Sequence, residues 1–258
     1  MKKIIPLVLL SILAVIAVAQ DKPQEKQPWP NWDKSKAEKM LNSSPWAQTQ
    51  VDTDTAELTY RPTTTGTSTI GSSTSSSAGS AAVNPSRSVQ NDRMDRGATN
   101  QALSVNYHVR FLSAKPIRQA FARMIELQDK NNKGVREQLA PFVDRDFSDF
   151  IVVAVTFDSS DNRLAGPAFQ AFSSATTGTL KNQAYLERSD GKRLFVLDYK
   201  PPISDGLGAK FIFPRQVDGQ PFLGESGDVR FFAQLSDKIT LNTKYKLQDM
   251  VYQGKLEY

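Results

Sequence analysis

The stretch Leu103 to Lys130 constrains the fold most strongly, because two structural periods meet within it. From Leu103 to Phe111 the apolar residues stand at every second position, which is typical of a strand with one buried face. After Ser113 they recur on one helical stripe that begins at Ile117. We expect Ser113 to cap this helix and Pro116 to lie in its first turn, where no amide hydrogen is needed. A strand therefore leads directly into an amphipathic helix, and each must bury one face.

The N-terminal segment predicts export. Two lysines precede the apolar run Ile4 to Ala19, and small residues favour cleavage after Ala19. The alternative is a membrane anchor, but the run is shorter than the roughly 20 residues of a spanning helix and contains Pro6. We expect a secreted or periplasmic protein that loses residues 1–19 and then has no stable membrane span. Residues 20–31 are predicted to form an extended leader.

Composition excludes several chemistries. The chain has no cysteine, which rules out disulfides, zinc-thiolate sites, thiol nucleophiles and lipid attachment at a cysteine. It has one histidine, so a multi-histidine metal site is impossible, and we expect no metal and no cofactor. The net charge of +5 includes two lysines of the predicted signal peptide, and the remaining basic residues are scattered. Nucleic acid is therefore not an expected partner.

Residues 62–100 differ in kind from the rest of the chain. They are rich in Ser, Thr and Gly and almost free of large apolar residues, so we predict a disordered segment. The segment could join two domains or form a loop within one. We favour the loop, because the part before it is too small to form a core alone. The stretch Ala47 to Tyr60 is partly alternating and is a plausible edge strand, and its part Val51 to Tyr60 would then lie beside Leu103 to Phe111. Residues 32–258 would form one domain.

A short helix is predicted from Lys34 to Asn42, with Asp33 as its cap. Three tryptophans flank it, Trp29, Trp32 and Trp46. Exposed tryptophans could form a platform for sugar rings. We favour a docking role, because such a short helix is marginal unless large aromatic side chains hold it on a core.

The remainder predicts a second helix and then mostly antiparallel strands. The apolar run Phe150 to Phe157 indicates a central strand covered on both faces. Asp190 and Gly191 lie between two alternating runs, which predicts a hairpin. The further expected elements are a helix at Val135 to Val143, an ambiguous segment that permits a short helix from Pro167, and strands at Leu180 to Arg188, Arg193 to Tyr199, Ala209 to Phe213, Val229 to Leu235, Ile239 to Leu247 and Met250 to Leu256. The fold class is therefore α+β, with a largely antiparallel sheet or sandwich and two helices inserted after an early strand.

Four segments carry a resemblance to a known family: Ser44 to Ala47, Arg110 to Ala120, Asp205 to Arg215 and Leu247 to Tyr258. In these segments the chain resembles a family of uncharacterised secreted proteins of acidobacterial type. The resemblance covers the chain from about Trp32 onward, without the Ser/Thr-rich segment. It implies a single domain, and it implies no activity, cofactor or site residue.

Two candidate catalytic features rest on His108 and on acidic residues. A Ser-His-Asp arrangement would have to use His108. Its strand parity places it opposite the apolar face, and we interpret it as a polar residue facing solvent or a helix. Carboxylate pairs suit glycoside hydrolysis, and acidic residues gather at Asp144, Asp146 and Asp149 and again at Asp158 and Asp161. Turns and caps are the commoner use of such residues.

Two further patterns suggest ligand contacts. Asp52 and Asp54 could contact calcium, but no glycine or distal glutamate follows at loop spacing. Asp205 to Lys210 has two glycines before a lysine, yet it lacks the phosphate-loop spacing and leads into a strand, so a tight turn is expected. If this loop holds a ligand, Lys210 and Arg215 are the residues we expect to bind it.

Two functions from different classes remain. The first is an exported non-enzymatic protein that binds or scaffolds an unknown envelope component or protein partner at the bacterial envelope or exterior. The alternative is a secreted hydrolase that uses carboxylates between Asp144 and Asp161. The absence of a catalytic constellation in the sequence favours the first.

Overall fold

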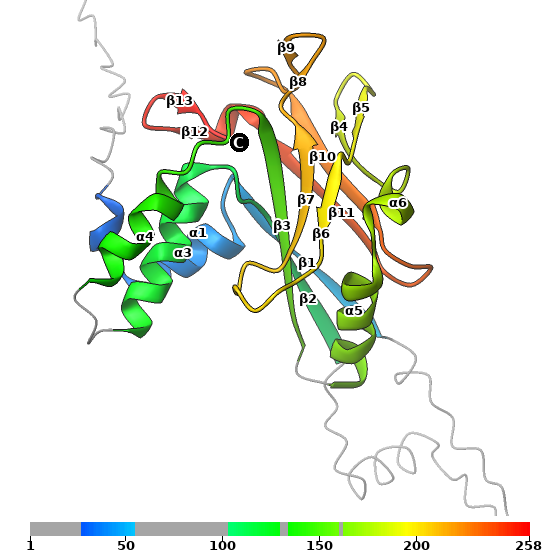
Figure 1. Cartoon of the computed structure of the whole chain (residues 1–258), viewed down its shortest axis with the longest axis horizontal. Coiled ribbons are helices and arrows are strands. Elements are labelled where there is room, and N and C mark those ends of the chain that lie inside the picture. The colour runs from blue at the N-terminus through cyan, green and yellow to red at the C-terminus, as the bar shows by residue number, and fades with distance from the viewer. Residues whose placement is uncertain (1–26, 55–102, 130–133, 160–161) are drawn as a thin grey trace, which may run out of the picture.

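The computed structural model describes residues 27–54, 103–129, 134–159 and 162–258. The predicted signal peptide, most of the predicted leader and the Ser/Thr-rich segment 62–100 lie outside the described residues. Two antiparallel sheets carry the fold, and helices lie around them (Figure 1). The predicted α+β class, with a largely antiparallel arrangement and two helices after an early strand, is confirmed.

The larger sheet has five strands in the order β1-β2-β3-β7-β6. Their bounds are Ala47–Asp54 for β1, Leu103–Phe111 for β2, Phe150–Ser159 for β3, Asp198–Lys200 for β6 and Ala209–Pro214 for β7. The predicted pairing of the first two strands is confirmed, since β1 runs antiparallel to β2 with Ala47 opposite Arg110. β1 begins at Ala47, as does the predicted edge strand, although the pairing was expected only from Val51 onward; residues 55–60 lie outside the described residues. β3 is central, and Ile151 to Val155 are buried.

The smaller sheet has four strands in the order β11-β10-β4-β5. Their bounds are Ala184–Arg188 for β4, Arg193–Phe195 for β5, Asp228–Gln234 for β10 and Thr240–Lys246 for β11. The predicted hairpin is confirmed, with Gly191 at a φ of 82° in its turn. The prediction of one strand from Arg193 to Tyr199 was wrong. The chain changes sheets after Phe195, and the Leu197 amide donates to the Ile212 carbonyl of the larger sheet at 2.8 Å.

The inner faces of the two sheets pack together through aromatic side chains. Phe111 meets Tyr245 edge to face with ring centroids 4.9 Å apart, and Phe211 meets Phe231 at 5.2 Å. The buried Tyr245 hydroxyl donates to the Val109 carbonyl at 3.0 Å, which satisfies its one polar group. The core therefore lies between the sheets, as in a sandwich.

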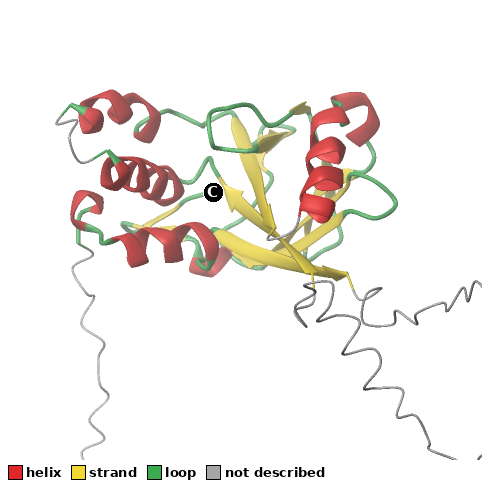
Figure 2. Cartoon of the chain, turned by 90° about the horizontal axis from the view of Figure 1, so that it is seen from below, coloured by secondary structure: helices red, strands yellow, loops and turns green. Residues whose placement is uncertain are grey.

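The helices form two groups (Figures 1 and 2). The 3-10 turn η1 (Trp29–Asn31) lies with α1 (Lys34–Asn42), α3 (Lys115–Gln128) and α4 (Val135–Val143), whereas α5 (Asn162–Ser174) and α6 (Thr177–Leu180) lie apart from them. The predicted bounds of α1 and α4 are confirmed, and Pro116 lies in the first turn of α3. Ser113 does not cap α3, because its hydroxyl accepts the Val152 amide of β3 at 3.1 Å. α5 starts at Asn162, so a helix start at Pro167 was wrong.

The tail forms short elements instead of the single predicted strand at Met250 to Leu256. After the 3-10 turn η3 (Leu247–Asp249), β12 (Val251–Tyr252) and β13 (Lys255–Leu256) pair as a hairpin. A second small hairpin joins β8 (Gln216–Val217) to β9 (Gln220–Pro221). Gly254 has a φ of 77°, a left-handed conformation that no continuous strand contains.

The docking role predicted for the tryptophans is confirmed for two of them. Trp32 is 2% exposed and Trp46 is 3% exposed, so neither offers a platform for sugar. The Trp46 indole donates to the Glu257 carbonyl at 2.7 Å and meets the Tyr252 ring edge to face at 6.2 Å. The N-terminal helix is thus tied to the tail of the chain.

Candidate ligand-binding site

The outer face of the five-stranded sheet carries polar side chains at the positions that alternate with the core. Thr49 of β1 stands opposite His108 of β2, and His108 stands opposite Thr156 of β3. Asn106 stands opposite Asp158. Directly paired residues of an antiparallel sheet share a face, so these five side chains form one patch. The predicted position of His108, off the buried apolar row, is confirmed.

A continuous hydrogen-bond chain crosses three strands of this patch. The Thr49 hydroxyl lies 2.9 Å from Nδ1 of His108, and Nε2 of His108 lies 2.5 Å from Oδ1 of Asp158. The Asn106 amide donates to Oδ2 of Asp158 at 3.0 Å. The His108 side chain is only 16% exposed, whereas the Asp158 side chain is 62% exposed. The imidazole is therefore held in place while the carboxylate remains accessible.

Side chains of the same outer face and of the turn after α1 bond to the carbonyl groups at the C-terminal end of α1. The Thr49 hydroxyl donates to the Asn42 carbonyl at 3.0 Å, and Nε of Arg110 donates to the Leu41 carbonyl at 2.6 Å. The Ser44 hydroxyl donates to the Met40 carbonyl at 2.7 Å. The last carbonyls of a helix have no partner within the helix, so these side chains replace the missing bonds.

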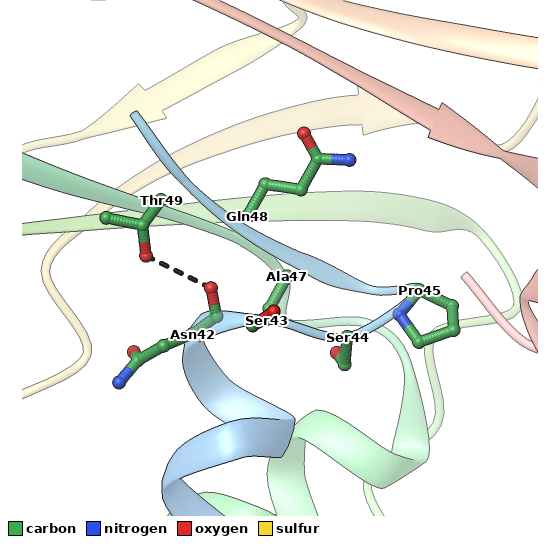
Figure 3. A pocket seen from close by; sticks show the side chains of 7 residues that line it. All are labelled: Asn42, Ser43, Ser44, Pro45, Ala47, Gln48 and Thr49. Carbon is green, nitrogen blue, oxygen red and sulfur yellow. Dashed lines mark hydrogen bonds between the residues drawn. The ribbon is translucent and has the colours of Figure 1, made fainter. Parts of the chain in front are cut away.

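An open depression adjoins this helix end (Figure 3). It has a volume of about 740 Å³ and lies where α1 passes into β1. Its lining residues, none of which is charged, are Asn42, Ser43, Ser44, Pro45, Ala47, Gln48 and Thr49. Hydroxyl and amide groups, which both donate and accept hydrogen bonds, are therefore the chemistry that this surface offers.

Charged groups flank the depression on the sheet. Desolvation raises the pKa of Asp158, but the hydrogen bonds from His108 and Asn106 and the charges of His108 and Arg110 outweigh it, so this pKa lies below its ordinary value. Burial lowers the pKa of Arg110 to about 10, against the opposing effect of Tyr245 and Asp158. Asp158 is therefore an anion and Arg110 a cation at neutral pH.

The structure does not bring Lys210 and Arg215 together. Lys210 lies near the start of β7, where its ammonium is 2.7 Å from Oδ2 of Asp205. Arg215 follows the end of β7, where its guanidinium donates to the main-chain oxygen of Tyr258 at 2.7 Å and covers the Tyr258 ring at 4.1 Å. Each cation is held by the chain itself. Ligand binding by either one stays a prediction.

The loop before β7 is the tight turn that the sequence predicted. Gly206 and Gly208 have φ values of 72° and 79°. A Cβ on Gly208 would lie 2.2 Å from the Val155 carbonyl oxygen, so only glycine fits there. This loop is shaped by its approach to β3.

The two acidic groups proposed for hydrolysis lie at opposite ends of β3. Asp149 immediately precedes β3 and Asp158 is near its end, so about 30 Å of strand separates them at roughly 3.3 Å per residue. Within the first group, Asp144 pairs with the Lys115 ammonium at 2.8 Å, and Asp146 accepts the Ser148 amide at 3.0 Å in a turn. Asp161 lies outside the described residues. Carboxylates of a glycosidase flank one bond at about 5 to 9.5 Å, so a pair formed by Asp149 and Asp158 is contradicted.

The chain of hydroxyl, imidazole and carboxylate has the composition of a nucleophilic triad, but its hydrogen bonds are not directed as in one. A triad histidine removes the hydrogen of the nucleophile. Thr49 has one hydroxyl hydrogen, and it is donated to the Asn42 carbonyl. His108 therefore has no hydrogen to accept from Thr49 in this arrangement, and Thr49 is not activated.

Sequence reasoning missed Thr49 and Asn42. The predicted edge strand lay within Ala47 to Tyr60 and contained Thr49, but its pairing with Leu103 to Phe111 was placed at Val51 to Tyr60, which hid the pairing of Thr49 with His108. The usable signal was strand parity, because Thr49 shares its parity with Val51 and lies on the same face once the strand is extended backward.

The fold and the site define an α+β sandwich with a polar outer face on its larger sheet. No protein-family model and no curated protein matches the chain. Among solved structures, a novel protein of unknown function from Burkholderia pseudomallei is similar over 54% of this chain and 72% of that chain, with 7% sequence identity and a TM-score of 0.35. So distant a similarity carries no argument about function. The resemblance to the acidobacterial-type family stays a prediction.

The described part of the chain contains neither a cluster of metal ligands nor a membrane-spanning helix. There, no group of three or more histidine and acidic side chains is arranged to hold a metal ion. No helix within the described ranges has the length and apolar character needed to cross a membrane.

Proposed function

We propose that the protein is an exported, non-enzymatic binding module of the bacterial envelope or exterior that holds a hydroxyl-rich ligand in the depression at the end of α1. The observation that carries this proposal is the lining of the depression, which has hydroxyl and amide side chains and no charged one. Sugar hydroxyls also donate and accept hydrogen bonds, so a neutral glycan of the envelope matches these groups. The predicted signal peptide supplies the export.

The shape of the site supports a polymer more than a small molecule. Pockets for small ligands enclose most of the ligand surface. This depression is open and runs onto the exposed Thr49 of β1 (Figure 3). A chain of sugars could cross it while its ends remain in solvent, and strands and a capped helix hold the lining in position.

The test is a thermal-shift panel on the protein with neutral glucans, N-acetylated aminosugar oligomers, acidic uronate oligomers and envelope peptides. A ligand at 100 times its Kd stabilises the folded state by about 2.7 kcal/mol, so a neutral glycan is expected to raise Tm measurably. The absence of a rise with every probe would contradict the proposal.

A blocking variant locates the site. Ser43 is exposed and lines the depression, so Ser43→Trp fills it and is expected to abolish the thermal shift. The matched control is Ser173→Trp at an exposed position of α5, which should respond like the unmodified protein. An undiminished shift in Ser43→Trp would place the ligand elsewhere. Fractionation of cells that express the full chain tests export.

A further inference from the structure

The hydrogen positions around His108 follow from the groups that its two ring nitrogens face. A carbonyl oxygen can only accept, so the Thr49 hydroxyl must be the donor in its 3.0 Å bond to the Asn42 carbonyl. The one hydrogen of Thr49 is then committed. Nδ1 of His108, 2.9 Å from the same hydroxyl oxygen, must therefore donate to it.

The second ring nitrogen also faces an acceptor. Nε2 lies 2.5 Å from Oδ1 of Asp158, whose other oxygen accepts from the Asn106 amide at 3.0 Å. The lowered pKa of Asp158 makes this group a carboxylate above acidic pH, and an ionised carboxylate has no hydrogen to give. Both ring nitrogens must carry hydrogen, so the observed arrangement contains His108 as the imidazolium.

Within the described residues, few charged and polar groups bond to the ring or to its partners. They are the Asp158 carboxylate and Thr156 hydroxyl from β3, the Thr49 hydroxyl from β1, the Asn42 carbonyl from α1, and Asn106 and Arg110 on the strand of His108 itself. Arg110 opposes a second positive charge, but its guanidinium donates to Leu41, Thr156 and Asn42. The Asp158 carboxylate accepts from the ring at Nε2.

We propose that His108 is a proton-operated clasp that sets the state of the depression, an inference that rests on the proposed function. With the proton bound, His108 donates to the Thr49 hydroxyl oxygen. The Thr49 hydroxyl then donates to the Asn42 carbonyl, which satisfies that carbonyl at the end of α1. When the proton leaves Nδ1, that nitrogen becomes an acceptor, and the Thr49 hydroxyl turns to donate its hydrogen bond to Nδ1. The Asn42 carbonyl then loses its partner, which removes one of the hydrogen bonds that hold the segment lining the depression.

The direction of the effect follows. Histidine changes charge between pH 5 and 8, so the lining has the Thr49–Asn42 bond at the acidic end of that range and loses it at the basic end. A ligand that needs the held lining binds more weakly as the pH rises. The ring atom that loses the proton is Nδ1, because Nε2 keeps its hydrogen, which it donates to the Asp158 carboxylate.

The test needs no ligand and uses the fact that the chain has one histidine. In ¹⁵N,¹³C-labelled protein, NMR follows both ring nitrogens of His108 and the carbonyl carbon of Asn42 from pH 5 to 8. We expect the Nδ1 signal to change to that of an unprotonated nitrogen while Nε2 keeps its hydrogen, and the Asn42 carbonyl signal to shift with the same midpoint.

Two variants make this result specific. Thr49→Val keeps the shape of the side chain and removes the hydroxyl, so the Asn42 signal should no longer follow His108. Thr49→Ser restores the hydroxyl and should restore the coupling. An Asn42 signal that ignores the titration in the unmodified protein, or a neutral ring with its hydrogen on Nδ1, would overturn the clasp. Since no ligand is present, failure of the proposed binding function would leave this readout unchanged.

Discussion

The inner and outer faces of the five-stranded sheet are made by the same strands and have opposite characters. On β2, Val109 and Phe111 point to the second sheet and are fully buried, whereas His108 and Arg110 point to the other side and bond to α1 and β3. The inner face stabilises the fold through apolar burial. The outer face fixes polar groups in a defined geometry, which a binding site requires and a core does not.

The largest effect is expected from breaking the inner face. Phe111→Ala removes a ring that is 0% exposed and packs on Tyr245, and it should cost about 3 to 5 kcal/mol of unfolding free energy. The matched control, Val51→Ala, changes a side chain that is 56% exposed and should stay within about 0.5 kcal/mol. Urea unfolding measures both, and similar losses would refute the contrast between faces.

The close approach of the Gly208 backbone to β3 should be nearly as sensitive to substitution as the core. Gly206→Ala strains a left-handed residue with open space around it and should cost about 1 to 2 kcal/mol. Gly208→Ala adds a contact 2.2 Å from the Val155 carbonyl oxygen and should cost clearly more. Urea unfolding of the two variants compares the strain alone with strain plus clash, and equal losses would contradict the close approach.

A loss of unfolding free energy smaller than that of Gly208→Ala is expected where the edges of the two sheets meet. The Gln50 side chain donates to the Thr240 carbonyl at 2.8 Å and accepts the Asn242 amide at 2.8 Å, so it joins β1 to β11. Gln50→Leu keeps the bulk and leaves these two main-chain groups unpaired, at an expected cost of about 1 to 3 kcal/mol. A change in the urea midpoint too small to resolve would show that water replaces the glutamine.

The smallest effect is the acid dependence of Asp158. Its folded pKa is lowered, so it stabilises the fold above the ordinary aspartate value of about 3.9, and this contribution is lost as the pH falls through the folded pKa. Because the side chain is 62% exposed, the contribution should be below about 1 kcal/mol. Urea unfolding at pH 3 and pH 7 should show a smaller acid loss in Asp158→Asn. An identical acid loss in both proteins would contradict the pairing with His108.

Local signals in the sequence predicted much of the fold. The bounds of β2, α1 and α4 follow from a period and from end signals that lie within each segment. The errors arose where distant residues decide. Ser113 faces a free amide of β3 and bonds to it instead of capping α3, and the chain after Phe195 pairs with the other sheet. Neither event has a signal in its own segment.

The candidate site could be predicted only in part. Parity placed His108 on the outer face of β2, and the structure agrees. Its direct partners come from β1 and β3, and Thr49 links it to α1, so the site depends on a register that begins where Ala47 bridges to Ser44. A sequence shows which face a residue occupies, but the register between separate strands comes from the assembled sheet.

The most direct test of the contrast between faces is NMR shift mapping with the neutral glycan that gives the largest thermal shift. We expect amide signals to change in residues 42–49 and at the outer-face positions of β2 and β3. Signals of core residues in the four-stranded sheet, such as Phe231 and Leu241, should stay constant. Changes confined to the four-stranded sheet or spread through the core would contradict this expectation.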